Sequence, residues 1–335
     1  MKVMAVRAQG ELFTEEERDM PQPNAGEVLI KVHACGICHS DHLVPDGLWQ
    51  NQQYPRVPGH EVAGVVEGIG DGEARLKVGD KVGVGWHGGH DGTCNTCLAG
   101  HLQRCENAQV TGITTDGGYA EYMIAPSVAC ANIPDTLALE EAAPLMCAGV
   151  TSFNALKNSG ASPGDLVGIQ GLGGLGHVAI QYAKAMGYEV VAISRGADKA
   201  SFAEELGADH YIDTQVSPVS EQLFAHGGAK AILATAPNAA SISALADGLS
   251  VQGCLMVLGV PGEPIEINVQ GLVSFTRRIQ GWSSGTAVDS TAAMAFAQAH
   301  GIKPMIEVFP LSQANKAFEK MMAGNIRFRA VLTMD

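Results

Sequence analysis

The sequence predicts an α/β protein with a β-rich domain and a doubly wound parallel-sheet domain, and three observations carry this prediction. Up to about residue 150, short β-like runs such as EVLIKVHAC and GDKVGVG are separated by Gly and Pro clusters. From there on, apolar strand-like runs alternate with segments of helical periodicity. The glycine-rich turn GLGGLG lies between the first of these strands and its helix.

The elements of the second domain follow one another in a regular order. DLVGIQ (165–170) is a predicted strand, and after the turn Leu175, Val178 and Tyr182 recur at helical spacing. Further strands are predicted at EVVAIS (189–194), HYI (210–212), AKAILAT (229–235), CLMVLG (254–259) and RRIQGWS (277–283). After them we expect one or two helices and a last strand, RAVLTM (329–334), that returns to the first domain.

The length of 335 residues suits two such domains, which we place at 1–148 with 290–335 and at 149–289. With 46% hydrophobic and 17% charged residues, the chain can form a packed core. The net charge of −14 disfavours nucleic acid or an anionic membrane surface as partner. No apolar run reaches the length of a membrane span, and the polar N-terminal segment lacks a signal-peptide core, so we expect a cytoplasmic protein.

The turn after the first strand has the G-x-G-x-x-G pattern of Gly171, Gly173 and Gly176. Its position between a strand and an amphipathic helix is the context that favours dinucleotide binding over a plain glycine-rich turn. The first glycine makes the turn, the second lets a pyrophosphate approach the backbone, and the third lets helix and strand pack closely. The helix N-terminus favours the phosphate charge.

The end of the second strand indicates which dinucleotide is bound. An NAD site usually carries Asp or Glu there, whereas this chain has Ser194 and Arg195. A hydroxyl can bond a 2′-phosphate and a guanidinium can pair with it, so we predict NADP, with NAD as the alternative. The alternative explanation is that Arg195 is a solvated turn residue and that the site does not discriminate between NADP and NAD.

Eight cysteines in a reducing compartment indicate metal ligands, catalytic groups or buried apolar residues rather than disulfides. Cys94, Cys97 and Cys105 lie together in GWHGGHDGTCNTCLAGHLQRC, one ligand short of the four that a closed zinc site needs. Three others lie in apolar surroundings and are expected in the core: Cys35, Cys130 and Cys254.

Cys38, His60 and Cys147 are spread over 110 residues, and each alone could be a core residue. Several motifs nevertheless fall in one order along the chain: CGICHSD, GHEVAG, the cysteine cluster, LMCAGVT and GLGGLG. In this order the sequence resembles, from end to end, the zinc-dependent alcohol dehydrogenases of the medium-chain dehydrogenase/reductase superfamily. The resemblance implies a GroES-like catalytic domain, a Rossmann-fold cofactor domain, and reversible hydride transfer between a primary alcohol or aldehyde and a nicotinamide cofactor.

The resemblance also implies which residues bind the catalytic zinc. Cys38, His60 and Cys147 match its three protein ligands, which leave the fourth position open to water or alcohol. Glu61 matches a carboxylate that approaches the metal when substrate leaves. Zinc lowers the pKa of a bound alcohol and polarises an aldehyde. Thiolates and an imidazole are needed here because they bind the zinc ion that supplies this chemistry.

Two neighbours of the ligands have implied roles as well. Asp41 matches the residue that orients His60, and Ser40 matches the hydroxyl that bonds the alcohol oxygen and starts a proton relay. Many relatives end this relay with a histidine at the position of Leu43. The adjacent His42 is a weak candidate for that role, and release of the proton to water is the other.

For the cysteine cluster, the resemblance implies a second, structural zinc. Relatives carry C-x2-C-x2-C-x7-C here, and Cys94, Cys97 and Cys105 fit its last three places. Asp91 occupies the first place, and a carboxylate oxygen is an accepted zinc ligand. His90, one residue out of register, is the competitor. We therefore predict two Zn²⁺ per chain.

The remaining implied residues line the substrate and cofactor sites. Trp49, Trp86 and Tyr119 would narrow the substrate pocket and favour slender or flat molecules, although aromatic residues that merely pack are common. Other cofactor contacts are implied for Thr151, Gly174, Leu175, Val260 and Arg329. The compact length is typical of tetrameric members, so we expect a homotetramer, with a homodimer as the alternative.

Two other functions compete with alcohol dehydrogenase activity as an explanation of this sequence. A zinc-free quinone reductase of the same superfamily would share the nucleotide fold but lack the ligands Cys38, His60 and Cys147. A non-catalytic, zinc-stabilised binding protein would keep the cysteine cluster but leave the open ligand set unexplained. Metal analysis and an NADPH oxidation assay with aldehydes separate the three.

Overall fold

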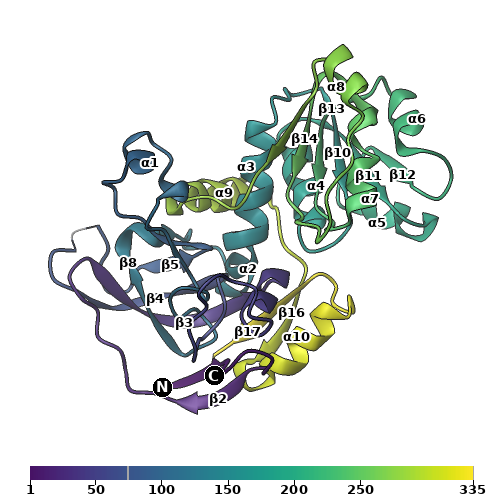
Figure 1. Cartoon of the computed structure of the whole chain (residues 1–335). Helices are drawn as coiled ribbons and strands as arrows, with labels where there is room; N and C mark the ends of the chain where they lie inside the picture. Colours follow the sequence, from purple (N-terminus) through teal and green to yellow (C-terminus); the bar gives the residue numbers. More distant parts are fainter. Residues whose placement is uncertain (74, 335) are drawn as a thin grey trace. The chain divides into compact units, whose positions relative to one another are not determined.

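The computed structural model describes residues 1–73 and 75–334, which form two compact units (Figure 1). The β-rich unit comprises Met1–Val150 and Ser284–Asp335, and the parallel-sheet unit comprises Thr151–Ser283. Each unit has its own hydrophobic core, one centred on β-strands of the first and one on the parallel sheet of the second.

The parallel-sheet unit is built on six parallel strands in the order β12-β11-β10-β13-β14-β15. Their bounds are β10 (Leu166–Gln170), β11 (Glu189–Ser194), β12 (His210–Asp213), β13 (Ala229–Ala234), β14 (Leu249–Val257) and β15 (Arg278–Gly281). Numbered along the chain, this is the order 3-2-1-4-5-6 of doubly wound dinucleotide folds. The predicted fold class and all six predicted strands are thus confirmed.

Helices connect the parallel strands, as right-handed crossovers require. They are α4 (Gly176–Ala185), α5 (Ala200–Glu205), α6 (Val219–Phe224), α7 (Ala239–Ser243) and α8 (Val269–Ser274), and a further helix, α3 (Val150–Asn158), precedes β10. Helix α4 starts directly at the last glycine of GLGGLG and packs on β10 and β11. Its buried residues Val178, Ala179 and Tyr182 follow the helical period that the sequence displays.

The β-rich unit is organised around a seven-stranded sheet in the order β16-β17-β3-β4-β5-β9, with β8 also paired to β3. These strands are β3 (Glu27–Ile37), β4 (Val62–Ile69), β5 (Lys81–Val84), β8 (Tyr122–Pro126), β9 (Cys130–Asn132), β16 (Ile306–Pro310) and β17 (Arg329–Thr333). Two smaller pairs join β1 (Lys2–Ala5) to β2 (Thr14–Glu17) and β6 (His87–Gly89) to β7 (Gln109–Val110).

The central strand β3 positions the site, because it ends at Ile37, one residue before Cys38. It is hydrogen-bonded to β4, β8 and β17, so its end is held on both sides. The partner β17 comes from the C-terminal tail, which therefore lies in the same sheet as β3, β4 and β5. Strand β16, at the edge beside β17, is not among the strands that the sequence predicts.

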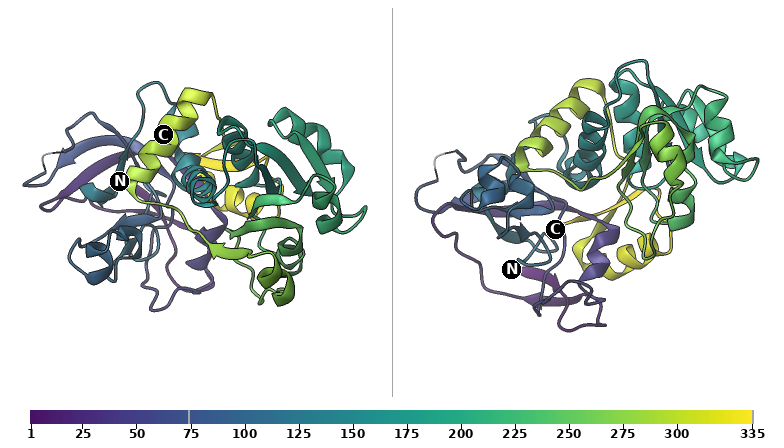
Figure 2. Two further views of the ribbon diagram at one scale, coloured as in Figure 1. Left: turned by 90° about the horizontal axis from the view of Figure 1, so that it is seen from above. Right: turned by 45° about the horizontal axis from the view of Figure 1, so that its top comes forward.

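Helices and short turns complete the β-rich unit: α1 (Asn95–Leu98), α2 (Leu139–Pro144), α9 (Ala287–His300) and α10 (Ala314–Met322), with the 3₁₀ turn η1 (His39–Leu43) and the π-helical turn η4 (Leu145–Gly149). Helix α9, the long yellow-green helix in Figure 2, starts with a capping box at Thr286 and Asp289 and packs against β9 and η4. Among the described residues, no helix is long and apolar enough to cross a membrane.

Candidate functional site

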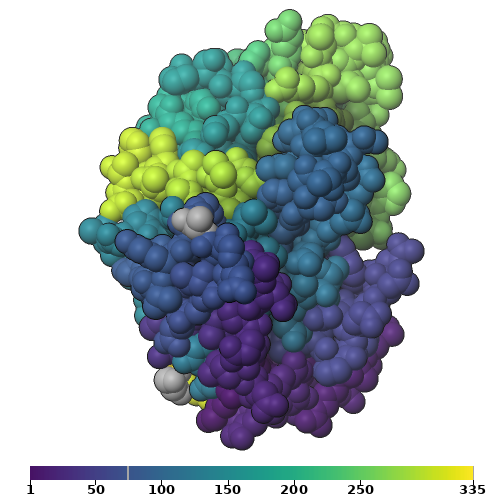
Figure 3. Space-filling model, turned by 90° about the vertical axis from the view of Figure 1, so that its left-hand side faces the viewer, coloured from purple at the N-terminus to yellow at the C-terminus, as the bar shows by residue number. Residues whose placement is uncertain are grey.

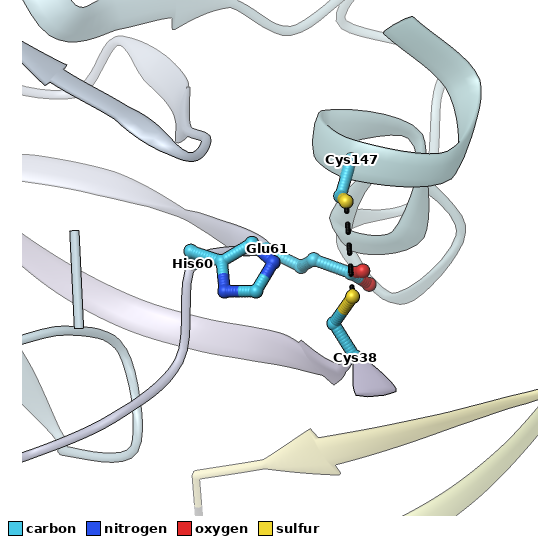
Figure 4. A group of neighbouring side chains, drawn as sticks. All are labelled: Cys38, His60, Glu61 and Cys147. Carbon is cyan, nitrogen blue, oxygen red and sulfur yellow. Dashed lines mark hydrogen bonds between the residues drawn. The ribbon is translucent and has the colours of Figure 1, made fainter. Parts of the chain in front are cut away.

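Four ligand-type side chains from three distant segments converge in the β-rich unit (Figure 4). Cys38 caps the turn η1 at the end of β3, His60 and Glu61 precede β4, and Cys147 lies in the π-helical turn η4. One ligand atom from each lies within 4.8 Å of the others. Three of the four residues are fully buried, and Cys147 is partly exposed, so the cluster combines a dry interior with one accessible side.

The spacing of the two thiols matches a shared metal ion and not a disulfide. The Sγ atoms of Cys38 and Cys147 are 3.9 Å apart. A disulfide would bring them to about 2.05 Å. Two thiolates bound tetrahedrally to one zinc at about 2.3 Å stand about 3.8 Å apart. The pair is therefore spaced as the donors of a zinc site are.

A buried carboxylate fixes the imidazole of the cluster. Oδ1 of Asp41 lies 3.0 Å from Nδ1 of His60. Oδ2 of Asp41 accepts hydrogen bonds of 2.8 Å from the backbone N–H of Cys38 and from the hydroxyl of Tyr119. Nε2 of His60 is buried and has no hydrogen-bond partner among the described residues. A buried nitrogen is rarely left in this state, so Nε2 fits a metal ligand.

Glu61 is held by a partner that the sequence alone does not indicate. Its Oε1 accepts a hydrogen bond from Nη2 of Arg329, and both side chains are almost completely buried. Its other oxygen occupies space that only glycine leaves free, because a Cβ at Gly36 would lie 2.0 Å from Oε2. The Glu61 carboxylate therefore has a defined position beside the other ligand-type side chains, next to Gly36 of β3 and Arg329 of β17.

Burial and charge set the proton affinities in this cluster. Burial raises the pKa of Glu61 to about 7, against the opposing charge of Arg329. The hydrogen bond from Cys147 lowers the pKa of Cys38, and the same bond raises the pKa of Cys147. The two thiols therefore release their first proton more readily than their second, as expected for facing acids.

A second cluster of ligand-type side chains lies in the segment around α1, which forms a surface lobe drawn in blue in Figure 3. Ligand atoms of Asp91, Cys94, Cys97 and Cys105 lie within 4.8 Å of one another. The Sγ atoms of Cys94 and Cys105 are 3.9 Å apart, again the separation of two zinc-bound thiolates. Backbone N–H groups point at these sulfurs, for example from Cys97 to Cys94 at 3.4 Å.

The geometry distinguishes the two candidates for the fourth position of this cluster. The exposed Asp91 directs its carboxylate toward its own loop, where Oδ1 accepts from the N–H groups of Thr93 and Cys94 and Oδ2 accepts from Asn107 at 2.6 Å. These hydrogen bonds lower the pKa of Asp91, so the group is a carboxylate at neutral pH. The ring of His90 instead stacks on that of His87, with centroids 5.2 Å apart.

The predicted pocket residues separate into two groups. The indole of Trp86 packs edge-on against His60 at 5.0 Å, and that of Trp49 against Trp86 at 5.9 Å. Tyr119, expected in the same pocket, is fully buried with its hydroxyl on Asp41, so it supports the cluster from beneath and does not line a pocket.

The residues of the expected proton relay lie on the turn η1. Ser40 is half-buried there, two positions after Cys38. Leu43 packs against the hydrophobic core of the β-rich unit. Nδ1 of His42 lies 3.0 Å from a carboxylate oxygen of Asp46, so this imidazole is engaged on the outer side of the turn.

In the parallel-sheet unit, the glycine turn has the shape that a dinucleotide site requires. Gly171 has a φ of +93°, and a Cβ at Gly176 would lie 1.7 Å from the carbonyl oxygen of Gly171, so neither position accepts a side chain. A Cβ at Gly173 would meet no atom within 4 Å. The turn is thus closed toward the sheet and open at the position where a pyrophosphate would approach.

The other predicted cofactor residues occupy varied environments. Ser194 ends β11 half-buried, and the exposed Arg195 follows it. Val260 is 86% exposed in the loop after β14, whereas Thr151 is buried on α3. Arg329, implied as a cofactor contact, is 5% exposed and paired with Glu61.

The sequence does not predict two contacts of the site, the hydrogen bond from Tyr119 to Asp41 and the ion pair of Arg329 with Glu61. It also does not predict that Gly36 must lack a side chain to leave space for Glu61. A buried tyrosine and arginine carry no sequence signal of their partners, which are 78 and 268 positions away.

Comparison with known proteins gives one consistent family. Residues 24–135 match the alcohol dehydrogenase GroES-like domain, and residues 174–304 match the zinc-binding dehydrogenase domain. An alcohol dehydrogenase, patD, from Penicillium expansum is 48% identical over 333 residues, which are 99% of this chain and 97% of the relative.

Solved structures agree with these matches. A cinnamyl alcohol dehydrogenase from Sorghum bicolor superposes with a TM-score of 0.89 at 34% identity and covers 99% of this chain and 97% of its own. A CAD from Helicobacter pylori, complexed with NADP(H), has a TM-score of 0.88 at 28% identity and covers 99% and 97%.

Proposed function

Since the chain belongs to the zinc-dependent alcohol dehydrogenases of the medium-chain dehydrogenase/reductase superfamily, we propose that it interconverts primary alcohols and aldehydes with NADP as cofactor. The reaction is proposed to take place at Cys38, His60 and Cys147. The observation that supports this assignment is the convergence of two buried thiols with an imidazole nitrogen that has no hydrogen-bond partner in the described part of the chain.

The donor set fits a catalytic zinc, because two thiolates and one imidazole leave a fourth position for substrate. Zinc held there would act as a Lewis acid on the alcohol or aldehyde oxygen, and the nicotinamide would carry the hydride. Asp41 keeps the proton of His60 on Nδ1 and so leaves Nε2 as the ligand atom. Glu61 is proposed to bind the zinc when substrate leaves, since its carboxylate lies beside the three ligands.

We propose that Ser40 bonds the reacting oxygen and passes its proton to water. This route is favoured because Leu43 replaces the histidine of many relatives and His42 is paired with Asp46. A His42→Ala variant should keep the pH–rate profile of the wild type. A displaced profile would instead place His42 in the relay.

The preference for NADP is proposed from Ser194 and the exposed Arg195, which offer a hydroxyl and a cation where NAD sites carry a carboxylate. Turnover with NADPH should exceed turnover with NADH, and Arg195→Ala should reduce the ratio of the two kcat/KM values by at least about tenfold, the lower limit for one charge-assisted hydrogen bond. A wild-type preference for NADH would overturn the assignment.

The substrate is proposed to be a slender or flat primary alcohol or aldehyde, because Trp86 packs directly on His60 and Trp49 packs on Trp86. A Trp86→Ala variant should raise kcat/KM for bulky aldehydes relative to short ones. An unchanged ratio would remove Trp86 from the pocket.

Asp91, Cys94, Cys97 and Cys105 are proposed to bind a second, structural zinc. The set has no open position, since four donors complete a tetrahedron. The protein is further proposed to be a cytoplasmic homotetramer, with a homodimer as the alternative. Light scattering on the purified protein gives the oligomeric state.

Zinc analysis combined with NADPH oxidation over a panel of aldehydes tests the main proposal. Two zinc ions per chain and turnover of aldehydes are expected. Zinc without turnover would favour the rival binding protein, and turnover without zinc would favour a metal-free reductase.

A further inference from the structure

A third group of metal-ligating side chains lies in the parallel-sheet unit, apart from the two clusters above. Glu189 is the first residue of β11, His210 is the first residue of β12, and His226 lies in the turn between α6 and β13. One carboxylate oxygen and two imidazole nitrogens lie within 4.8 Å of one another. No motif of the sequence includes these three residues.

The three side chains are held close by the backbone that carries them. Strands β11 and β12 are parallel with Val191 opposite His210, so Glu189 lies two positions away on the same face. Nε2 of His210 is 2.6 Å from Oε1 of Glu189. The rings of His210 and His226 are 4.2 Å apart between centroids. The carboxylate and both imidazoles therefore face one small volume.

We propose that Glu189, His210 and His226 bind a divalent transition-metal ion of the Zn²⁺, Ni²⁺ and Co²⁺ class. Two imidazoles and one carboxylate suit these ions, whereas Mg²⁺ and Ca²⁺ prefer oxygen donors alone. Donors bound at about 2.1 Å stand about 3.0–3.4 Å apart. The present 2.6 Å contact must open by about half an ångström, which the exposed Glu189 side chain can provide.

The position of this site separates it from the cofactor. Glu189 and His210 open their strands, whereas Ser194 closes β11, five residues or about 16 Å farther along. A metal at the opening ends does not compete with a dinucleotide at the closing ends. It ties two strands and the α6–β13 turn together, so its binding stabilises the parallel-sheet unit by linkage.

Equilibrium dialysis of the zinc-loaded protein against micromolar free Zn²⁺ tests the site, with bound metal counted by atomic emission. The wild type should bind one more Zn²⁺ per chain than the His226→Gln variant. Loss of this ligand should weaken the extra site at least tenfold, because even groups that only support a metal ligand are worth about 10- to 100-fold. His300→Gln, an exposed histidine of α9, is the matched control and should keep the extra ion.

Thermal unfolding gives a second readout that does not depend on counting ions. Added Zn²⁺ should raise the Tm of the wild type and of His300→Gln, but not that of His226→Gln or Glu189→Gln, and Mg²⁺ should raise none. Equal zinc content and equal Tm shifts in the wild type and His226→Gln would overturn the proposal. Because His226 is exposed in a turn, its substitution leaves the fold intact as a basis for this comparison.

Discussion

The two ligand clusters of the β-rich unit use similar donors but are assembled in opposite ways. Asp91, Cys94, Cys97 and Cys105 come from one short segment whose own backbone N–H groups point at the sulfurs. The cluster of Cys38, His60, Glu61 and Cys147 is drawn from three segments that only the folded sheet brings together.

The difference shows which contacts hold the side chains of each cluster in position. The local cluster is fixed by turns and needs little support from the core. The distributed cluster depends on buried partners, since Asp41 holds His60 and Arg329 holds Glu61. A metal ion held by the three supported ligands proposed above would keep one side open to a reacting molecule, whereas a closed set of four donors would leave none.

The largest expected effect comes from removing a ligand of the distributed cluster. A Cys147→Ser variant should lose one zinc per chain and at least about 1,000-fold in kcat/KM, because a Lewis acid supplies several kcal/mol of activation. The second zinc should remain, as counted by atomic emission. Cys130→Ser, a buried cysteine outside both clusters, should keep both ions and most activity. Loss of both zincs in Cys147→Ser would show that the clusters are not independent.

A smaller effect is expected from a residue that acts through a ligand. An Asp41→Asn variant should lower the affinity for the zinc of the distributed cluster by about 10- to 100-fold, because the imidazole loses its ionised partner. Tyr119→Phe should have a weaker effect in the same direction, since it removes one hydrogen bond to Asp41. Competition with a chelator measures both affinities. Unchanged affinity in Asp41→Asn would contradict the role assigned to this carboxylate.

The smallest effect on catalysis is expected in the local cluster. An Asp91→Ala variant should lose one zinc per chain and unfold at a lower temperature, while the remaining zinc sustains turnover. Asp91→Cys should restore the ion with a softer donor. His90→Ala, the neighbouring residue, should keep both ions. The reverse result, with zinc lost in His90→Ala and kept in Asp91→Ala, would exchange the two assignments.

Much of the parallel-sheet unit follows from the sequence, because its central strands β10, β11 and β13 are largely buried on both faces and appear as mostly apolar runs. The strand β16 does not, since IEVFP mixes charged and apolar residues and ends in proline. It becomes a strand by pairing with β17 at the edge of the sheet.

The candidate site divides in the same way. The residues proposed as ligands belong to sequence motifs, and the resemblance to a family identifies them as candidates. The partners Tyr119 and Arg329 carry no motif, and burial gave Tyr119 a role different from the one expected. Glu189, His210 and His226 carry no sequence signal, because strand pairing brings the first two together and a turn between α6 and β13 adds the third.

The discontinuity of the β-rich unit has a consequence for the order of events during synthesis. Strand β3, which leads into Cys38, gains its neighbour β17 only after residues 329–333 have been made. The parallel-sheet unit is one continuous segment and can close before that point. The segment from Asp91 to Cys105 spans a short loop and can form earliest of all. The order of synthesis thus allows this loop to form first, the parallel-sheet unit next, and the complete surroundings of Cys38, His60, Glu61 and Cys147 last.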